Sequence, residues 1–308
     1  MNTLRHPATL ALLLALSPLG HAAEDQGAGA AFFLSRDNEG FITRRMALEY
    51  LPDYQHADSL TGVRYTDHHY SQQDWKRDGQ QISLLQRHID PATTNGWKLD
   101  TGLFHQGSHD LLTLDGSYRL ALAERTGLEL FLNRDWVETQ ASLDRGVHFN
   151  FWGASLDQGL GDHLTLVALA GQQDFSDDNQ RTHGRLKLIY QPWLDLGLTL
   201  QARYRLYHSS RNDVGGDYFN PSNYEESMFA VGWRKRVQGW TTSLTAGLGR
   251  QQINDDPHSN TRLLELGLQS PLRGQQSLQL RAGYNQSASF NGPDYRYRYL
   301  QGEWIARF

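Results

Sequence analysis

The sequence contains no cysteine among its 308 residues. This absence excludes a disulfide scaffold, a zinc site with thiolate ligands and a cysteine nucleophile. A lipid anchor attached to an N-terminal cysteine is excluded for the same reason. No motif for another cofactor is recognisable, so we expect the protein to work without a cofactor.

Long apolar segments and excess positive charge are also missing. Beyond the N-terminus, no stretch reaches the roughly 18 apolar residues that a membrane-spanning helix needs. Lys and Arg number 29 against 34 Asp and Glu, which gives a formal net charge of −5. Nucleic acid is therefore not an expected partner, because binding to phosphates needs concentrated positive charge.

The composition is polar on average and yet rich in aromatic residues and glycine. Mean hydropathy is −0.60, while the chain holds 29 Gly, 14 Tyr, 12 Phe and 8 Trp. Three classes remain: a disordered chain, a soluble all-β protein, and a barrel whose apolar residues alternate with polar ones around a wide lumen.

The N-terminus has the features of a secretory signal peptide. Arg5 and His6 precede an apolar run over residues 8–19, and small residues at Gly20 and Ala22 fit a cleavage site after Ala22. The run is too short to span a membrane comfortably as a helical anchor. We therefore predict a signal peptide over residues 1–22 and a single domain over 23–308.

Alternation with a period of two residues runs through this domain. In the clearest segment, Leu198, Leu200, Ala202 and Tyr204 are separated by polar residues, which is the pattern of a strand with one apolar face. The alternating segments run about 10 to 14 residues, longer than the usual strand of 5 or 6. Tilted strands that cross a membrane need about 9 to 11 residues, so length favours a transmembrane barrel over a soluble sandwich.

Sixteen such segments can be counted, although 14 or 18 strands remain possible. We predict an all-β fold, a closed antiparallel transmembrane β-barrel, because an open sheet in lipid would leave edge N–H and C=O groups unpaired. The predicted strands are 28–36, 40–51, 60–71, 79–89, 96–106, 111–123, 126–139, 146–158, 163–175, 181–191, 196–208, 224–237, 239–252, 260–270, 276–288 and 295–308.

The spacing between segments and the position of aromatic residues fit an outer-membrane barrel. Short connections such as 124–125 alternate with longer ones such as 74–78, 140–145 and 209–223. An even number of strands places both termini on one side, which we expect to be the periplasm. Aromatic residues near segment ends fit the interfacial girdles of such barrels; they are Tyr50, Trp97, Trp136, Tyr190, Trp193, Trp240 and Tyr284.

The C-terminus resembles the assembly signal of barrels inserted into the Gram-negative outer membrane. Phe308 is the last residue, and apolar residues precede it at Ala306, Trp304 and Leu300. We expect Trp304 and Phe308 to be recognised by the barrel assembly machinery. The expected surroundings of the folded chain are outer-membrane lipid and lipopolysaccharide.

A barrel of sixteen strands encloses a lumen wide enough for water and solutes, so transport is the main functional hypothesis. Parity places charged residues and tyrosines inside, a mixture that suits sugars through ring stacking and forked hydrogen bonds. A structural network that stiffens the wall is the alternative. The predicted pore-lining residues are Arg119, Glu129, Arg185, Lys187, Arg203, Arg205, Tyr207, Arg281, Tyr299 and Glu303, with Trp152 assigned to the same face.

One segment resembles a known family. Residues 215–226, Gly-Gly-Asp-Tyr-Phe-Asn-Pro-Ser-Asn-Tyr-Glu-Glu, are similar to the G-G-Y-F-x-P-x-x-Y element in barrel domains of exopolysaccharide export porins. These include the poly-N-acetylglucosamine export porin and the outer-membrane subunit of the cellulose synthase operon. The resemblance implies a sixteen-stranded barrel that passes a nascent polysaccharide. The tetratricopeptide region of those proteins is absent here, so export would need periplasmic partners.

The same segment is a candidate gate. Glycines allow tight backbone turns and proline stops strand pairing, so the loop over 209–223 has the composition to fold into the lumen. An ordinary surface loop is the alternative. The predicted gate residues are Gly215, Gly216, Tyr218, Phe219, Pro221 and Tyr224.

Two other functions are weighed against export. A general or substrate-specific diffusion porin would share all the barrel features. A barrel hydrolase would need a catalytic cluster, and His105, Ser108, His109 and Asp110 are the best candidates, because a His–Asp pair can activate water or a hydroxyl. Gly107, Ser108 and Asp110 are equally ordinary turn residues. We predict no enzyme, and no metal site at the histidines.

Overall fold

The computed structural model describes residues 25–211, 213–271, 275–288 and 295–308. The predicted signal peptide, 1–22, lies outside these residues. Sixteen strands and one short helix make up the described chain: β1 (Gly27–Asp37), β2 (Ile42–His56), β3 (Ser59–Gln72), β4 (Trp75–Ile89), β5 (Gly96–Gln106), β6 (His109–Ala123), β7 (Thr126–Trp136), α1 (Gln140–Arg145), β8 (His148–Gly159), β9 (Leu164–Phe175), β10 (Gln180–Tyr190), β11 (Leu198–Ser209), β12 (Asn223–Val237), β13 (Trp240–Ile253), β14 (Ser259–Gln269), β15 (Gln276–Gln286) and β16 (Arg296–Arg307).

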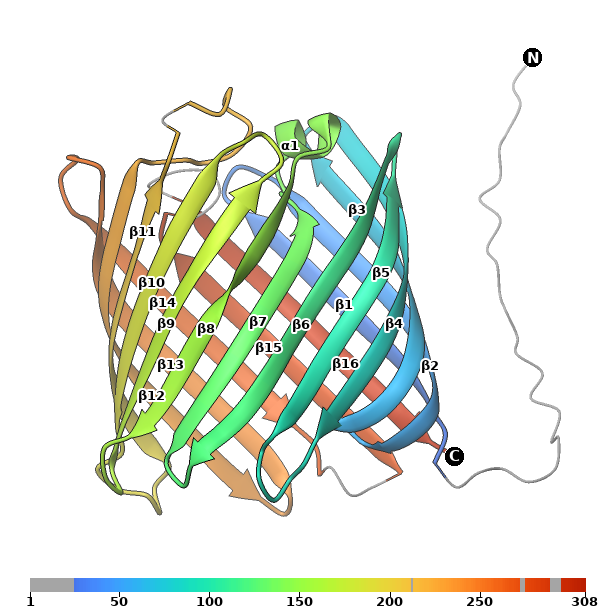
Figure 1. The fold of residues 1–308 in the computed structure, drawn as a ribbon, viewed down its shortest axis with the longest axis vertical. Coiled ribbons are helices and arrows are strands. Elements are labelled where there is room, and N and C mark those ends of the chain that lie inside the picture. The colour runs from blue at the N-terminus through green and yellow to red at the C-terminus, as the bar shows by residue number, and fades with distance from the viewer. Residues whose placement is uncertain (1–24, 212, 272–274, 289–294) are drawn as a thin grey trace, which may run out of the picture.

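The strands form one closed antiparallel barrel. Each strand pairs with its neighbours in the chain, and β1 closes the ring by pairing with β16, from Gly27 opposite Arg307 to Asp37 opposite Tyr297. Figure 1 shows the tilted strands, with the C-terminus at the end of the barrel opposite α1. The predicted fold class and the count of sixteen are confirmed.

The boundaries differ from the sequence prediction by three residues or more in three places, and elsewhere by two or fewer. β4 begins at Trp75, so the long connection predicted at 74–78 is wrong, and the turn after β3 consists of Gln73 and Asp74. β2 continues to His56 through a bulge. β7 ends at Trp136, and part of the following connection is helical where we expected strand and then loop.

Capping residues fix both ends of helix α1. Thr139 takes the N-cap position, and its side-chain oxygen accepts a hydrogen bond from the Ser142 backbone N–H at 3.1 Å. Gly146 ends the helix with a left-handed backbone, φ 70°. In the described residues, no helix is long and apolar enough to cross a membrane.

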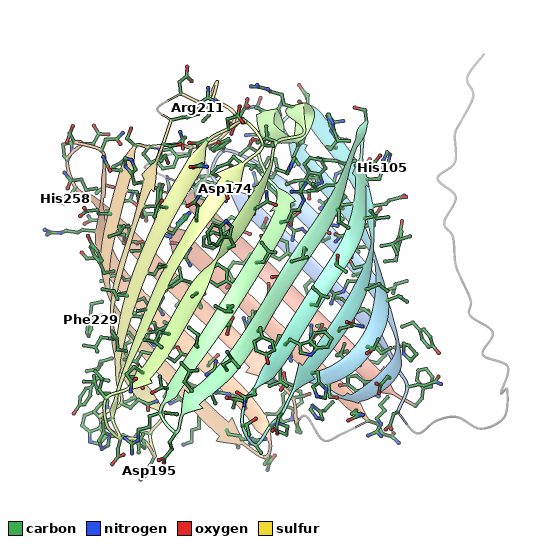
Figure 2. The ribbon with its side chains drawn as sticks, viewed as in Figure 1. His105, Asp174, Asp195, Arg211, Phe229 and His258 are labelled. Atoms are coloured by element: carbon green, nitrogen blue, oxygen red, sulfur yellow. The ribbon has the colours of Figure 1, made fainter. Side chains whose placement is uncertain are left out.

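The outer face of the wall carries a band of exposed aliphatic and aromatic side chains. Such a band is what the hydrocarbon layer of a membrane covers in transmembrane barrels. Exposed tyrosines and tryptophans collect at the end of the barrel where Phe308 lies, among them Tyr50, Tyr190, Trp193 and Trp240. Central members of the band include Leu48, Ile82, Leu103, Leu132, Leu186, Phe229 and Leu248; Figure 2 shows Phe229 on the outside of the wall.

Trp136 does not belong to the outer girdle that the sequence suggested. It is buried, and it packs with Phe104, Leu111 and Leu143 inside the barrel at the α1 end. The prediction was wrong because the chain turns inward after β7 to form the α1 connection, which carries the ring with it.

The parity of the wall can be tested with a single arginine. Leu186 lies at the middle of β10 and faces outward between Arg185 and Lys187. Leu186→Arg should lower the free energy of unfolding in lipid by about 2–4 kcal/mol, the cost of arginine near the bilayer midplane. The control, Gln279→Arg, adds the same side chain to the inner face and should cost much less. Equal stability of the two variants in urea titrations of liposome-embedded protein would contradict this assignment.

Candidate pore and its lining

The inner face of the barrel carries many polar and charged side chains. Side-chain parity and register place all ten predicted lining residues there. They fall into two groups: Arg185, Lys187, Arg203, Arg205 and Tyr207 lie on the neighbouring strands β10 and β11, whereas Arg119, Glu129, Arg281, Tyr299 and Glu303 lie on β6, β7, β15 and β16.

Trp152 faces outward, so its assignment to the lumen was wrong. Its neighbour Phe151 is the inward residue, with its ring 4.9 Å from the ring of His183. The Trp152 indole is exposed and donates a hydrogen bond to Asp174 on the outer surface at 3.1 Å. Both neighbours are aromatic, so the sequence pattern did not separate the two faces.

Charges on the β2–β6 and β16 side of the lumen are matched in pairs. The Arg64 guanidinium lies 2.7 Å from carboxylate oxygens of both Glu49 and Asp100, and 3.7 Å from Glu303. Arg87 reaches Glu303 as well, at 3.8 Å. Arg64, Arg87, Asp100 and Glu303 line a cavity of about 710 Å³ within the lumen. Their mutual neutralisation fits the wall-stiffening role that the sequence analysis left open.

The other predicted charged lining residues have different partners. Arg119 forms its ion pair with Asp157 at 3.2 Å, and Glu129 lies opposite Arg119 in the register of β6 and β7. Arg205 forms an ion pair with Glu226 and donates to the Tyr224 hydroxyl at 2.8 Å. The structure therefore ties Arg205 into the wall.

Four aromatic rings descend from the α1 end into the lumen along β16 and β1. Centroid separations are 6.1 Å from Tyr295 to Tyr297, 5.9 Å from Tyr297 to Tyr299 and 6.4 Å from Tyr299 to Phe33. The Arg45 guanidinium lies over the Phe33 ring, 5.0 Å from its centroid. We call Phe33, Tyr295, Tyr297 and Tyr299 the aromatic ladder; such rings can stack on the apolar faces of sugars.

Described segments of three connections lie at the α1 end, and the first two of these connections fold into the mouth. The β7–β8 connection inserts the fully buried Leu143 among Phe41, Tyr70 and Phe104. The β11–β12 connection, 210–222, places Tyr218 on the Phe175 ring, with centroids 4.6 Å apart. Of the β15–β16 connection, Ser287 accepts a hydrogen bond from Arg205 at 2.8 Å; residues 289–294 lie outside the described chain.

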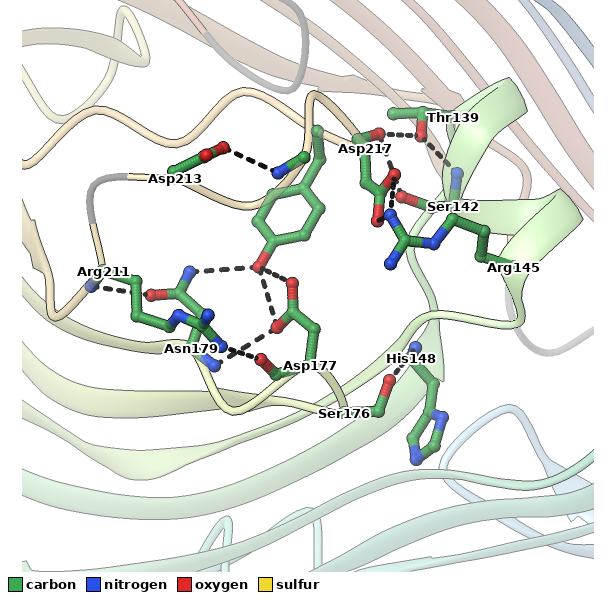
Figure 3. Close-up of polar contacts among 12 residues, drawn as sticks. Thr139, Ser142, Arg145, His148, Ser176, Asp177, Asn179, Arg211, Asp213 and Asp217 are labelled. Carbon is green, nitrogen blue, oxygen red and sulfur yellow. Dashed lines mark hydrogen bonds and ion pairs between the residues drawn. The ribbon is translucent and has the colours of Figure 1, made fainter.

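The first two of these connections are joined by polar contacts around Asp217 (Figure 3). The Asp217 carbonyl accepts hydrogen bonds from the hydroxyls of Thr139, at 2.5 Å, and Ser142, at 3.0 Å. Its carboxylate forms an ion pair with Arg145 at 2.7 Å. A pocket of about 570 Å³ lies between the two connections.

The 210–222 connection is also fixed to the neighbouring turn, 176–179. The Tyr218 hydroxyl donates to Asp177 at 3.0 Å and accepts from Asn179 at 3.0 Å. Burial raises the pKa of Tyr218 above its ordinary value, and Asp177 adds to the shift, so the hydroxyl keeps its proton. Gly215 and Gly216 take left-handed φ values of 66° and 75°.

The remaining predicted gate residues are placed as follows. Phe219 packs against a cluster that contains Tyr207 and Tyr224, and Pro221 is buried. Tyr224 is in β12 rather than in the loop, and its ring stacks on Tyr207 at 4.7 Å. At the other end of the chain, Trp304 and Phe308 are exposed.

The histidine cluster is not assembled into a catalytic site. His105 and Asp110 form an exposed pair, 2.7 Å apart, on the outer surface, and Figure 2 places His105 near the α1 end. His109 faces inward, toward Trp136. His68 and His69 likewise point to opposite faces, because adjacent strand residues do. Within the described residues, no three His, Asp or Glu side chains are grouped to hold a metal ion.

Sequence reasoning missed several residues of the mouth. Arg181 shares the parity of Arg185, and its guanidinium lies over the Phe175 and Tyr207 rings at 5.2 and 4.6 Å; extending the alternation by four residues would have identified it. Thr139 and Gly146 are a recognisable pair of helix caps. The role of Asp217 has no local signal, because it depends on contact between two distant connections.

Comparisons with known proteins give a match in fold alone. No family model matches the chain, and no curated protein matches it. Among solved structures, the barrel is similar to a bacterial polysaccharide outer membrane secretin, with a TM-score of 0.67, 14% identity, and coverage of 94% of this chain and 100% of that one. OmpTdeltaL8 of Vibrio cholerae and OpdQ of Pseudomonas aeruginosa also match, with TM-scores of 0.43 and 0.42, identities of 9% and 10%, and coverage of 91% of this chain and 98% of theirs. The barrel therefore has the fold of an outer-membrane secretin, as the resemblance to export porins implied.

Proposed function

We propose that the protein is an outer-membrane channel that passes a nascent exopolysaccharide or oligosaccharide from the periplasm to the exterior by passive transport. The first described residues, next to β1, and Phe308 lie at one end of the barrel, and we place that end in the periplasm. The α1 end then faces the exterior. The surroundings are outer-membrane lipid and lipopolysaccharide, and delivery of a polymer to the lumen calls for periplasmic export partners.

The aromatic ladder is the observation that carries this proposal. A general diffusion pore has no need of ring faces in series, whereas a sugar chain slides along them by exchanging one stack for the next. The fold shared with a polysaccharide secretin at a TM-score of 0.67 supports the same choice. A surface hydrolase is the weakest alternative, because His105 and His109 lie on opposite sides of the wall.

The ladder predicts block by oligosaccharides. In planar bilayers, wild-type channels should be blocked by maltohexaose, and Tyr297→Ala with Tyr299→Ala should raise the half-blocking concentration by about three- to tenfold for each ring lost. Tyr65→Ala removes an outward tyrosine and should leave block unchanged. A wild-type channel that conducts freely without block would favour a general porin.

We propose further that the 210–222 connection restricts the mouth. Deleting residues 211–220 should raise single-channel conductance, and Arg145→Ala, which removes the ion pair with Asp217, should increase the frequency of open–closed transitions. Arg125→Ala breaks a comparable pair with Asp162, 2.6 Å long, at the other end, and should alter neither. Unchanged conductance in the deletion would make 210–222 an ordinary surface loop.

We propose that the barrel assembly machinery recognises the C-terminal strand through Phe308. Phe308 is exposed, and its backbone N–H already donates to the Gln26 carbonyl at 2.9 Å, so its ring is free to be recognised. Deleting Phe308 should slow the appearance of heat-modifiable barrel in pulse-chase experiments, while export to the periplasm continues. Phe308→Tyr keeps an aromatic ring and should assemble normally. Wild-type kinetics in the deletion would exclude this signal.

A further inference from the structure

We propose that the inner face of β10 and β11 is a binding site for sugar carboxylates, so that the transported polymer is anionic. This inference rests on the proposed saccharide channel and adds the chemical class of its substrate. The site consists of Arg185, Lys187 and Arg203, which we call the basic wall.

The register sets like charges side by side in the basic wall. Arg185 lies directly opposite Arg205, and Lys187 lies directly opposite Arg203. Like charges in such cross-strand pairs destabilise a sheet. Two such pairs at consecutive inward positions lower the stability of the folded barrel. A bound anion would offset the repulsion between these cations.

The protein supplies little of that compensation. Arg205 has Glu226 as its carboxylate partner. Within the described residues, the hydrogen bonds of the Arg203 guanidinium go to the uncharged Gln201 amide oxygen, at 2.7 and 3.0 Å. In the described part of the chain, Arg185 and Lys187 have no hydrogen-bond or ion-pair partner. On the neighbouring strand β9, apolar residues lie opposite them: Leu169 opposite Arg185 and Val167 opposite Lys187.

On the opposite side of the lumen, the cations do have carboxylate partners. There Arg64 alone has three carboxylates within 4 Å. Over β8 to β15, the inner-face carboxylates of the described residues are Asp157, Glu226 and Glu265. Asp157 forms its ion pair with Arg119 at 3.2 Å. Glu226 is bound to Arg205, and Glu265 accepts a hydrogen bond from Tyr299 at 3.4 Å. The basic wall is thus left with donors that face the lumen.

The donor chemistry and the surroundings fit an acidic sugar. A guanidinium can bind a carboxylate through two parallel N–H donors, and an ammonium adds a mobile point charge. Next to the wall, the Phe151 ring lies 4.9 Å from His183 and 5.0 Å from Phe131. These rings provide an apolar surface for the sugar ring beside the site for its carboxylate.

The test compares block of single channels by trigalacturonate and by maltotriose, an anionic and a neutral trisaccharide. Trigalacturonate should block wild-type channels at a lower concentration than maltotriose. Arg185→Gln with Lys187→Gln should raise the half-blocking concentration of trigalacturonate by at least about tenfold and leave that of maltotriose unchanged. The effect should shrink between 0.1 M and 1 M salt, where the screening length falls from about 10 Å to 3 Å.

A matched control removes two cations from the outer face, Arg44→Gln with Arg250→Gln, where both side chains are exposed. It should retain wild-type block by both sugars. Heat-modifiable mobility confirms that each variant is folded. Equal block of wild type by the two sugars, or an unchanged response to trigalacturonate in the basic-wall variant, would overturn the anionic substrate while leaving a saccharide channel. Absence of block by both sugars would overturn the saccharide channel itself.

Discussion

Closure of the barrel through the β1–β16 pairing is the constraint on which the rest of the structure depends. An unpaired backbone N–H or C=O in hydrocarbon costs several kcal/mol, and a sheet edge would present a whole row of them. The register from Gly27–Arg307 to Asp37–Tyr297 removes both edges together. It also fixes which residues face inward on every strand, because parity must agree all the way around the ring.

That enclosed inner face has two unlike halves. Around Arg64, bases and acids are neighbours and satisfy one another, which stiffens the wall and leaves little charge for a ligand. On β10 and β11, bases stand opposite bases, and most of them lack an acid. Since each half is built on the same kind of strand, the difference lies in side-chain identity alone. A solute in the lumen therefore experiences a field directed across the pore.

The mouth is shaped by burial as much as by polar contacts. Leu143 lies in an apolar cluster inside the wall, and Tyr218 stacks on Phe175, so two connections fold inward where they might have projected into solvent. Their meeting point at Asp217 is polar, with two hydroxyl donors and an arginine. The two connections are thus held to the wall by apolar packing and to each other by polar contacts.

Alternation with a period of two is a local property of an extended chain, so the sequence predicted the strands, a count of sixteen with 14 or 18 left open, and nearly every inward residue. It failed where neighbouring residues have the same character, as at Phe151 and Trp152, and where a chain end leaves the wall, as at Trp136. The folded chain was needed to show that Arg205 has a carboxylate partner in Glu226, whereas Arg185 and Lys187 have none in the described residues. It was also needed to show that Asp217 contacts Thr139. These outcomes depend on register and on contacts between segments far apart in the chain, and no local pattern encodes them.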